Sequence, residues 1–168
     1  PMIGETDLFY TCLPLFHANA LHLTTMRALI AGLPMALSRR FSASRFWDEI
    51  RRYGATTFNG LGAMIPILMK QPERANDGDN PVTYVFSAAC PASVWEAFEN
   101  RFNVKIMEGY GSVDGGGFSI GNYGNGPKGS LGKPTNEYRL VDDDGKDVPV
   151  GTSGELIFKV DNEKLRRV

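Results

Sequence analysis

Strand-like and helix-like runs alternate along the first 110 residues of the 168-residue chain. Short apolar runs typical of strands are followed by longer runs with helical spacing, and glycine or proline separates many of them. Strands are expected at 7–12, 34–37, 56–58, 83–87 and 104–107, and helices at 18–31, 44–53, 61–70 and 92–102, the last one directly after Pro91. Four strand–helix units in succession predict an α/β fold, with a mostly parallel sheet of about five strands flanked by helices.

The second expected helix illustrates the local signals. Ser42 is expected to cap it, and Gly54 to end it. Its apolar side chains fall on one stripe that would face the sheet, namely Phe46, Trp47, Ile50 and Tyr53. The polar stretch 71–80 is expected to be a surface loop.

The composition changes after residue 108. Ten of the 19 glycines fall between Gly109 and Gly132, which predicts a long irregular segment. Two strand-like runs follow at 137–141 and 155–160, separated by the turn sequence Asp-Asp-Asp-Gly at 142–145. A strand, an Asp-Gly turn and a strand are typical of a hairpin or small barrel. We therefore expect an α/β subdomain over 1–128 and the start of a small β-barrel subdomain over 129–168.

Composition excludes several classes of function. Hydrophobic residues make up 42% and charged residues 22%, which is typical of a globular protein. The net charge of −1 gives no footprint for nucleic acid or an anionic membrane. No apolar run is long enough to cross a bilayer, and no signal peptide is visible. Cys12 and Cys90 lie far apart, which indicates two free thiols in a reducing cytoplasm.

The stretch from Glu108 to Asp114 is the strongest functional signal. It reads Glu-Gly-Tyr-Gly-Ser-Val-Asp and follows a predicted strand. Bare backbone N–H groups can approach an anion, an aromatic ring can stack on a base, and a carboxylate can hold a hard cation. Nucleotide sites of open α/β sheets lie at strand ends of this kind.

Two further stretches occupy the ends of predicted strands. The sequence Leu-Pro-Leu-Phe-His at 13–17 places His17 just before a helix, where it could simply cap or pack. The sequence Ser-Ala-Ala-Cys-Pro at 87–91 puts small residues where a flat ring could approach the backbone, although small residues also permit tight helix–sheet packing. Alone, neither stretch distinguishes a functional role from a structural one.

Together, these motifs resemble the adenylate-forming enzymes, whose signature is Tyr-Gly-x-Thr-Glu. The order and approximate spacing match over 7–158, and His17 lies in an element similar to Pro-x-Phe-His of acyl-CoA synthetases. Surface stretches at 42–47 and 71–77 are similar to the crotonobetaine/carnitine–CoA ligase branch. The resemblance implies the central part of the large N-terminal domain of an acyl-CoA synthetase. Such an enzyme converts a carboxylate and ATP to an acyl-adenylate, with Mg²⁺, and then to a thioester with CoA.

The resemblance assigns roles to individual residues. It implies nucleotide binding by Ala88, Ala89, Cys90, Pro91, Glu108, Gly109, Tyr110, Gly111, Ser112 and Val113, and substrate binding by His17, Phe58, Gly111 and Ser112. Tyr110 would stack on adenine, Glu108 would accept a hydrogen bond from the exocyclic amine of adenine, and His17 would lie beside the acyl carboxylate. Asp114 would hold Mg²⁺, an ion that takes oxygen ligands. If the ligand is a betaine, Phe16, Phe58, Phe118 and Tyr123 are candidates for an aromatic cage.

The sequence departs from the family pattern at several of these positions. Alanines 88 and 89 replace the two glycines of Gly-Gly-Ala-Pro, and Cys90 replaces its alanine. Val113 stands where the family has threonine and so lacks a hydroxyl. Asp114 replaces glutamate, one methylene longer. These changes leave open a nucleotide- or acyl-binding module that is degenerate or stands alone without ligase activity.

Two glycine patterns are not interpreted as nucleotide sites. Residues 124–129 satisfy Gly-x-Gly-x-x-Gly, but no strand precedes them, no helix follows, and Pro127 lacks an N–H. Gly132-Lys133 is followed by Pro134 where a Walker loop needs serine or threonine. Two histidines and no clustered cysteines also argue against a structural zinc site.

The family's phosphate-binding loop is expected before Pro1, and its ribose-binding Thr-Gly-Asp and catalytic lysine after Val168. The isolated chain is therefore expected to bind ligands with little or no catalysis. A peptide-synthetase adenylation domain is a less favoured alternative, because the context of His17 is that of a CoA ligase. The acid, the thiol acceptor and the oligomeric state stay open.

Overall fold

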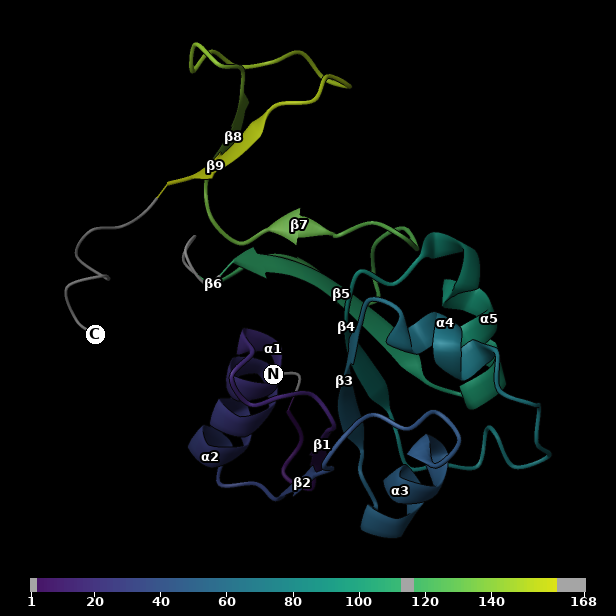
Figure 1. Cartoon of the computed structure of the whole chain (residues 1–168). Helices are drawn as coiled ribbons and strands as arrows, with labels where there is room; N and C mark the ends of the chain where they lie inside the picture. The colour runs from purple at the N-terminus through teal and green to yellow at the C-terminus, as the bar shows by residue number, and fades with distance from the viewer. Residues whose placement is uncertain (1–2, 113–116, 160–168) are drawn as a thin grey trace.

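A computed structural model describes residues 3–112 and 117–159. They form a seven-stranded sheet of order β2-β1-β3-β4-β5-β6-β7, flanked by helices, and a separate two-stranded sheet (Figure 1). The large sheet contains β1 (Phe9–Thr11), β2 (Met35–Leu37), β3 (Thr57–Leu61), β4 (Tyr84–Ala88), β5 (Lys105–Ser112), β6 (Gly117–Asn122) and β7 (Lys133–Pro134). The first five strands run parallel to one another, and β6 pairs antiparallel with both β5 and β7, which confirms the α/β class with a mostly parallel sheet.

One face of the sheet carries the helical segment 18–31, at the position that the sequence predicts. It consists of α1 (Ala18–Ala20), a π-helical stretch η1 (Leu21–Met26) and α2 (Arg27–Ala31). Gly32 ends it with φ of 67°, a left-handed conformation that glycine adopts at little cost. The guanidinium of Arg27 lies over the Phe86 ring, 5.2 Å from its centroid, so the helix is anchored to β4.

The opposite face carries α3 (Phe46–Tyr53), α4 (Met64–Met69) and α5 (Ala92–Phe102), and this face holds the main hydrophobic core. Phe58 on β3 packs edge-on against Phe46, with ring centroids 4.8 Å apart. Trp47 stacks on Phe102 at 4.4 Å. The predicted stripe on α3 is therefore buried, except at Tyr53, which is 44% exposed.

Three local expectations are wrong. Arg45, not Ser42, occupies the N-cap of α3, and no side chain bonds the free N–H groups there. Leu61 ends β3 instead of starting a helix. The glycine-rich segment begins as sheet before it becomes a loop after Asn122: β5 runs on to Ser112 and pairs with β6, with a register shift after Tyr110. Glycine weakens strand propensity, but the backbone groups here are satisfied by an antiparallel partner.

The loop after β6 is organised around the side chain of Asn122, which is 1% exposed. Its amide donates to the carbonyls of Pro127 and Ser130 at 3.0 and 3.1 Å. Its oxygen accepts the N–H groups of Gly124 and Gly126 at 3.2 and 3.0 Å. The expectation that no strand precedes the Gly-x-Gly-x-x-Gly pattern at 124–129 is wrong, because β6 ends at Asn122. The N–H groups of Gly124 and Gly126 are nevertheless bonded within the protein, which agrees with the rejection of the pattern as a dinucleotide site.

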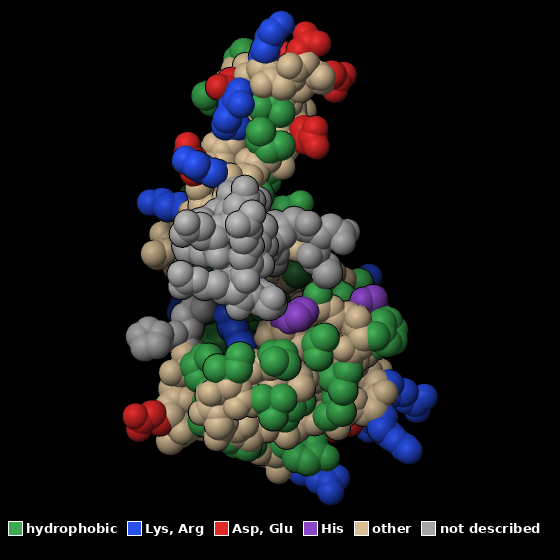
Figure 2. Space-filling model, turned by 90° about the vertical axis from the view of Figure 1, so that its left-hand side faces the viewer, with side chains coloured by type: hydrophobic (Ala, Val, Ile, Leu, Met, Phe, Trp, Pro, Cys, Tyr) green, Lys and Arg blue, Asp and Glu red, His purple; other side chains and the backbone are tan. Residues whose placement is uncertain are grey.

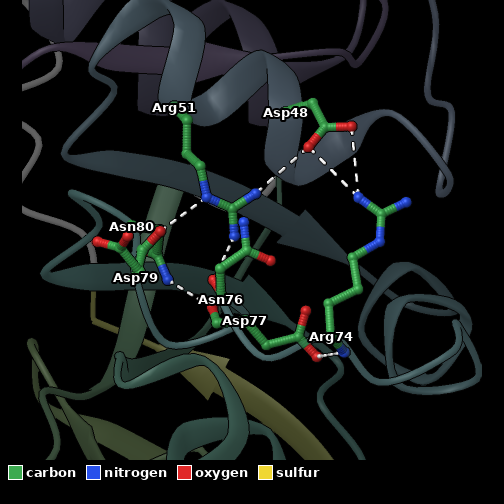
Figure 3. A network of polar contacts seen from close by, with 7 residues as sticks. All are labelled: Asp48, Arg51, Arg74, Asn76, Asp77, Asp79 and Asn80. Atoms are coloured by element: carbon green, nitrogen blue, oxygen red, sulfur yellow. Dashed lines mark hydrogen bonds and ion pairs between the residues drawn. The ribbon is translucent and has the colours of Figure 1, made fainter.

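The long polar loop at 71–80 is tied down by charged side chains (Figure 3). Arg51 of α3 donates to the carbonyls of Asp79 and Asn76 at 2.7 and 2.6 Å. Arg101 of α5 pairs with the buried carboxylate of Asp77 at 2.7 Å. The loop is therefore ordered against α3 and α5, although it contains no helix or strand.

The second sheet is a hairpin of β8 (Tyr138–Val141) and β9 (Glu155–Phe158), antiparallel as predicted. It projects from the main body beyond β7 (Figure 1). The main sheet continues through β7 at Lys133–Pro134, which lies past the expected boundary at 128. Within residues 3–112 and 117–159, no helix is both long and apolar enough to cross a membrane.

Candidate functional site

The carboxyl ends of the parallel strands β1 to β5 meet at one edge of the sheet. From β1, the chain passes first to β2 on one side and then to β3 on the other, so the order reverses between β1 and β3. Ligands of open α/β sheets bind outside the carboxyl ends of strands near such a reversal. The stretches around residues 17, 88 and 110, singled out from the sequence, all follow or extend strands at this edge.

The turn after β4 is held by a carboxylate from β5. Glu108 is 2% exposed, and its two oxygens accept the N–H groups of Ala89 and Cys90 at 2.6 and 2.9 Å. The N–H of Gly62, after β3, donates to the Ala88 carbonyl at 2.8 Å. Ala89 itself has φ of 70° and is exposed, whereas Cys90 is buried. This arrangement joins the ends of β3, β4 and β5 into one rigid ledge.

Tyr110 stands next to this ledge on a part of β5 that β4 does not cover. The pairing of β4 with β5 ends at Ser87 and Glu108, whereas β5 continues and pairs with β6 alone. The Tyr110 side chain is 43% exposed, so its ring is accessible to a ligand. An accessible ring beside bare glycine backbone suits a flat, polar heterocycle.

His17 lies at the start of α1, after the end of β1. Its backbone is extended, its N–H donates to the Pro14 carbonyl at 3.0 Å, and its carbonyl accepts the Leu21 N–H at 3.0 Å. The imidazole is exposed and contacts the ring of Phe16 at 4.5 Å between centroids. Phe16 is 82% exposed. The local sequence therefore presents an imidazole and an apolar ring to solvent.

The structure places one implied substrate residue in the core, and the implied metal residue lies outside the described ranges. Phe58 is 1% exposed and belongs to the core around α3, so its implied contact with substrate is not supported. Strand alternation explains this placement, because Phe58 points to the α3 face. Val113 and Asp114 lie outside the described residues, as does the side chain of Phe118. Within the described ranges, no cluster of three His, Cys, Asp or Glu side chains could hold a metal ion.

Asn59 is a buried polar residue at this edge that the sequence did not single out. Its amide nitrogen lies 3.2 Å from the carbonyl and 3.0 Å from the side-chain oxygen of Asn19, and 2.9 Å from the Thr24 hydroxyl. It therefore ties β3 to the segment that carries His17. The sequence signal was weak, a polar residue directly after Phe58.

Burial governs the chemistry of the two cysteines. It raises the pKa of the Cys90 thiol to about 12, and the Glu108 carboxylate adds to the effect. Burial likewise raises the pKa of Cys12 to about 12. Both thiols are free and buried, as the sequence predicts, and neither is suited to act as a nucleophile.

The face that carries α1 and α2 exposes apolar side chains, with histidine at its upper margin (Figure 2). Leu29 and Ile30 of α2 are 67% and 81% exposed. His17 lies at the N-terminal end of the helical segment that α2 completes. Apolar side chains are therefore exposed both beside His17, at Phe16, and on α2.

The chain is similar to known ligases. It is 37% identical to the medium/long-chain-fatty-acid–CoA ligase FadD17 of Mycobacterium marinum, over 92% of this chain and 31% of that protein. It is 39% identical to the steroid-22-oyl-CoA synthetase of Rhodococcus jostii, over 82% of this chain and 24% of that protein. A benzoate CoA ligase from Burkholderia xenovorans LB400 has the same fold, with a TM-score of 0.83 and 24% identity, over 98% of this chain and 37% of that one.

The chain thus spans about a third of the length of the relatives it matches. The family model described as AMP-binding enzyme matches residues 2–162, nearly the whole chain. The chain belongs to the AMP-binding enzyme family.

Proposed function

We propose that these residues form the nucleotide- and acid-binding part of an ATP-dependent acyl-CoA synthetase. The observation that carries the proposal is the position of Tyr110, accessible on the uncovered end of β5 beside the ledge. The match to the AMP-binding family over 2–162 supports it. The relatives named for fatty and steroid acids favour an apolar carboxylic acid as the substrate.

In the proposed site, adenine lies between the Tyr110 ring and the ledge of Ala88, Ala89, Cys90 and Pro91. Gly109, Gly111 and Ser112 follow the acyl-adenylate along β5. His17 donates to the acyl carboxylate, and the exposed apolar surface near Phe16 accepts the start of the acyl chain. These roles agree with the exposure of His17 and Tyr110 and with the closeness of β4 and β5.

The proposed reaction has two displacements. A carboxylate oxygen attacks the α-phosphorus of ATP and pyrophosphate leaves; the CoA thiol then attacks the acyl carbon, loses its proton, and AMP leaves. Orientation of the carboxylate and the α-phosphate is the contribution expected of these residues.

Asp114 is proposed as an oxygen ligand of Mg²⁺, which would neutralise phosphate charge. Val113 lies next to it in the sequence, and we propose that it lines the phosphates. We expect a cytoplasmic enzyme.

Tyr110→Ala tests the proposal in the full-length protein that contains this chain. The ring loses its stacking partner, so ATP should bind about 5- to 10-fold more weakly, as expected for roughly 1 kcal/mol of aromatic stacking. The KM for the acid should change less than twofold. Tyr138→Ala is a matched control, because Tyr138 is 51% exposed on the distant hairpin. An altered acid preference with unchanged KM for ATP would place the ring in the acyl pocket instead.

The 168-residue chain alone distinguishes the ligase segment from a binding module that lacks ligase activity. If the phosphate-binding loop and the catalytic lysine lie elsewhere in the protein, this chain should release no pyrophosphate from ATP with acid and CoA. The full-length protein should release it. A full-length protein that binds ATP and acid but forms no acyl-adenylate in a single turnover would favour the binding module.

A further inference from the structure

The Glu108 carboxylate is a buried charge that is compensated by backbone alone. It has no ion-pair partner within 3–112 and 117–159, and its two oxygens each accept one N–H, from Ala89 and Cys90. A buried carboxylate without such bonds would be costly. Hydrogen bonds to the charged form stabilise it, so carboxylate and turn hold each other in place.

The turn that Glu108 holds is strained. Ala89 has φ of 70°, and the one other non-glycine residue with positive φ in the described ranges is Asn103. Asn103 ends α5, where asparagine is well suited to the left-handed conformation. Alanine has no such advantage, and the conformation costs on the order of 1–2 kcal/mol. A residue in this conformation persists only where its surroundings determine it.

We propose that Glu108 is a positioning residue that fixes the turn at 88–91 as a preformed wall for the adenine ring, and that it does not bind the adenine amine. The inference rests on the proposed function. Both oxygens of Glu108 already accept backbone donors, and the side chain is 2% exposed. The wall is therefore set before the nucleotide arrives, and ordering it costs no binding energy.

Glu108→Gln in the full-length protein is the first test. The shape is kept, but the amide NH₂ faces a backbone N–H, so one of the two bonds becomes a donor–donor contact. ATP binding should weaken about tenfold, with the KM for the acid within twofold. The binding of purine riboside triphosphate, which lacks the 6-amino group, should weaken by the same factor. A loss for ATP only would show that Glu108 binds the amine, and would overturn the proposal.

Ala89→Gly provides the rescue. Glycine adopts positive φ without being held. When residue 89 is glycine, the loss of ATP affinity caused by Glu108→Gln should therefore be at least threefold smaller. The drop that Glu108→Gln causes in the midpoint of thermal unfolding should be about half as large. If the effects of Glu108→Gln and Ala89→Gly are simply additive, Glu108 does not hold the turn at 88–91, and the proposal is overturned. Glu99→Gln is the matched control, since Glu99 is 8% exposed and accepts the N–H of Ile106, a residue outside the turn at 88–91, at 2.9 Å. It should lower stability equally in both backgrounds.

Hydrogen exchange of the unsubstituted protein decides the case if the Gln variant does not fold. The amides of Ala89 and Cys90 should exchange as slowly as those of the β4–β5 pairing. If these two amides exchange at the rate of exposed loop amides, Glu108 does not hold the turn, and the proposal is overturned. The exchange and unfolding measurements need no nucleotide. If the two amides exchange slowly and the unfolding midpoints of the residue 89 and 108 variants are not additive, but the protein binds no ATP, then the proposed function is contradicted and the role of Glu108 in holding the turn is not.

Discussion

Asn122 fixes the shape of an entire loop through one side chain. Its amide and its oxygen together make four hydrogen bonds to the backbone of residues 124–130. A Cβ at Gly126 would lie 3.1 Å from the Asn122 side chain, which explains the glycine there. The loop also docks on α5 through an ion pair of Lys128 with Glu99 at 3.3 Å.

Asn122→Ala should therefore destabilise the protein by about 2–4 kcal/mol, because it removes four hydrogen bonds and leaves two carbonyls and two N–H groups without this partner. Urea unfolding measures the change. Asn125→Ala, in the same loop but exposed, should cost less than about 0.5 kcal/mol. Equal effects of the two variants would show that the loop does not depend on the Asn122 side chain.

Residue identity alone predicted some of this chemistry. Tyr110 and His17 were identified because a local motif carries them, and the structure leaves both side chains accessible. The bonds of Glu108 could not be predicted, because its partners lie 19 and 18 positions earlier in the chain. Phe58 was misplaced for a similar reason, since the face to which a strand residue points depends on the whole sheet.

At the scale of elements, the alternation of strands and helices over residues 7–107 was predictable because apolar spacing follows the period of each element. The antiparallel end of the sheet was not. Glycine in β5 and β6 predicts a loop locally, whereas the pairing of Gly109 with Gly121 makes it sheet. The prediction that Ser42 caps α3 was also wrong, because the sequence identifies a residue type that can cap a helix but not the residue at which the helix begins.

Gly132 makes the close approach of β7 to β6 possible. It has φ of 93°, and an added Cβ would collide with the Gly121 carbonyl oxygen. Gly132→Ala should lower the free energy of unfolding by more than 3 kcal/mol, because it combines a strained backbone with a clash. The amide of Thr135, which bonds the Ser119 carbonyl at 2.8 Å next to this strand pair, should then exchange faster.

Gly145→Ala separates the two causes. Gly145 has φ of 75° but no atom within 4 Å of an added Cβ. It should cost only about 1–2 kcal/mol, the strain of the left-handed conformation. If Gly132→Ala costs no more than this control in urea unfolding, the close approach of β7 to β6 is not needed for stability.

For the whole molecule, buried groups that must stay protonated limit stability at high pH. Burial raises the pKa of Cys12 and Cys90 to about 12, and burial together with the Glu49 hydrogen bond raises that of Tyr10 further. The folded state then binds more protons than the unfolded state above about pH 9. This stabilisation is present below pH 9 and is lost as the pH rises to about 12.

Thermal unfolding between pH 7 and 11 should therefore show a midpoint that is flat to about pH 9 and falls above it. Each thiol contributes at most about 1.4 kcal/mol per pH unit. Replacing both cysteines with alanine should make the fall shallower. The thiols should also be unreactive toward a disulfide reagent at pH 8 in the folded protein. Rapid reaction of either thiol would contradict its burial.

The two edges of the seven-stranded sheet affect how this chain behaves among copies of itself. Unpaired backbone groups along an edge strand invite another chain to add a strand and aggregate. Here β2 is three residues long, with Pro34 before it and two arginines shortly after it, and β7 is two residues long and contains Pro134. Proline cannot donate to a strand ladder. Such short, proline-bearing edges give the wide sheet little template for self-association, and they favour a chain that stays in solution at high concentration.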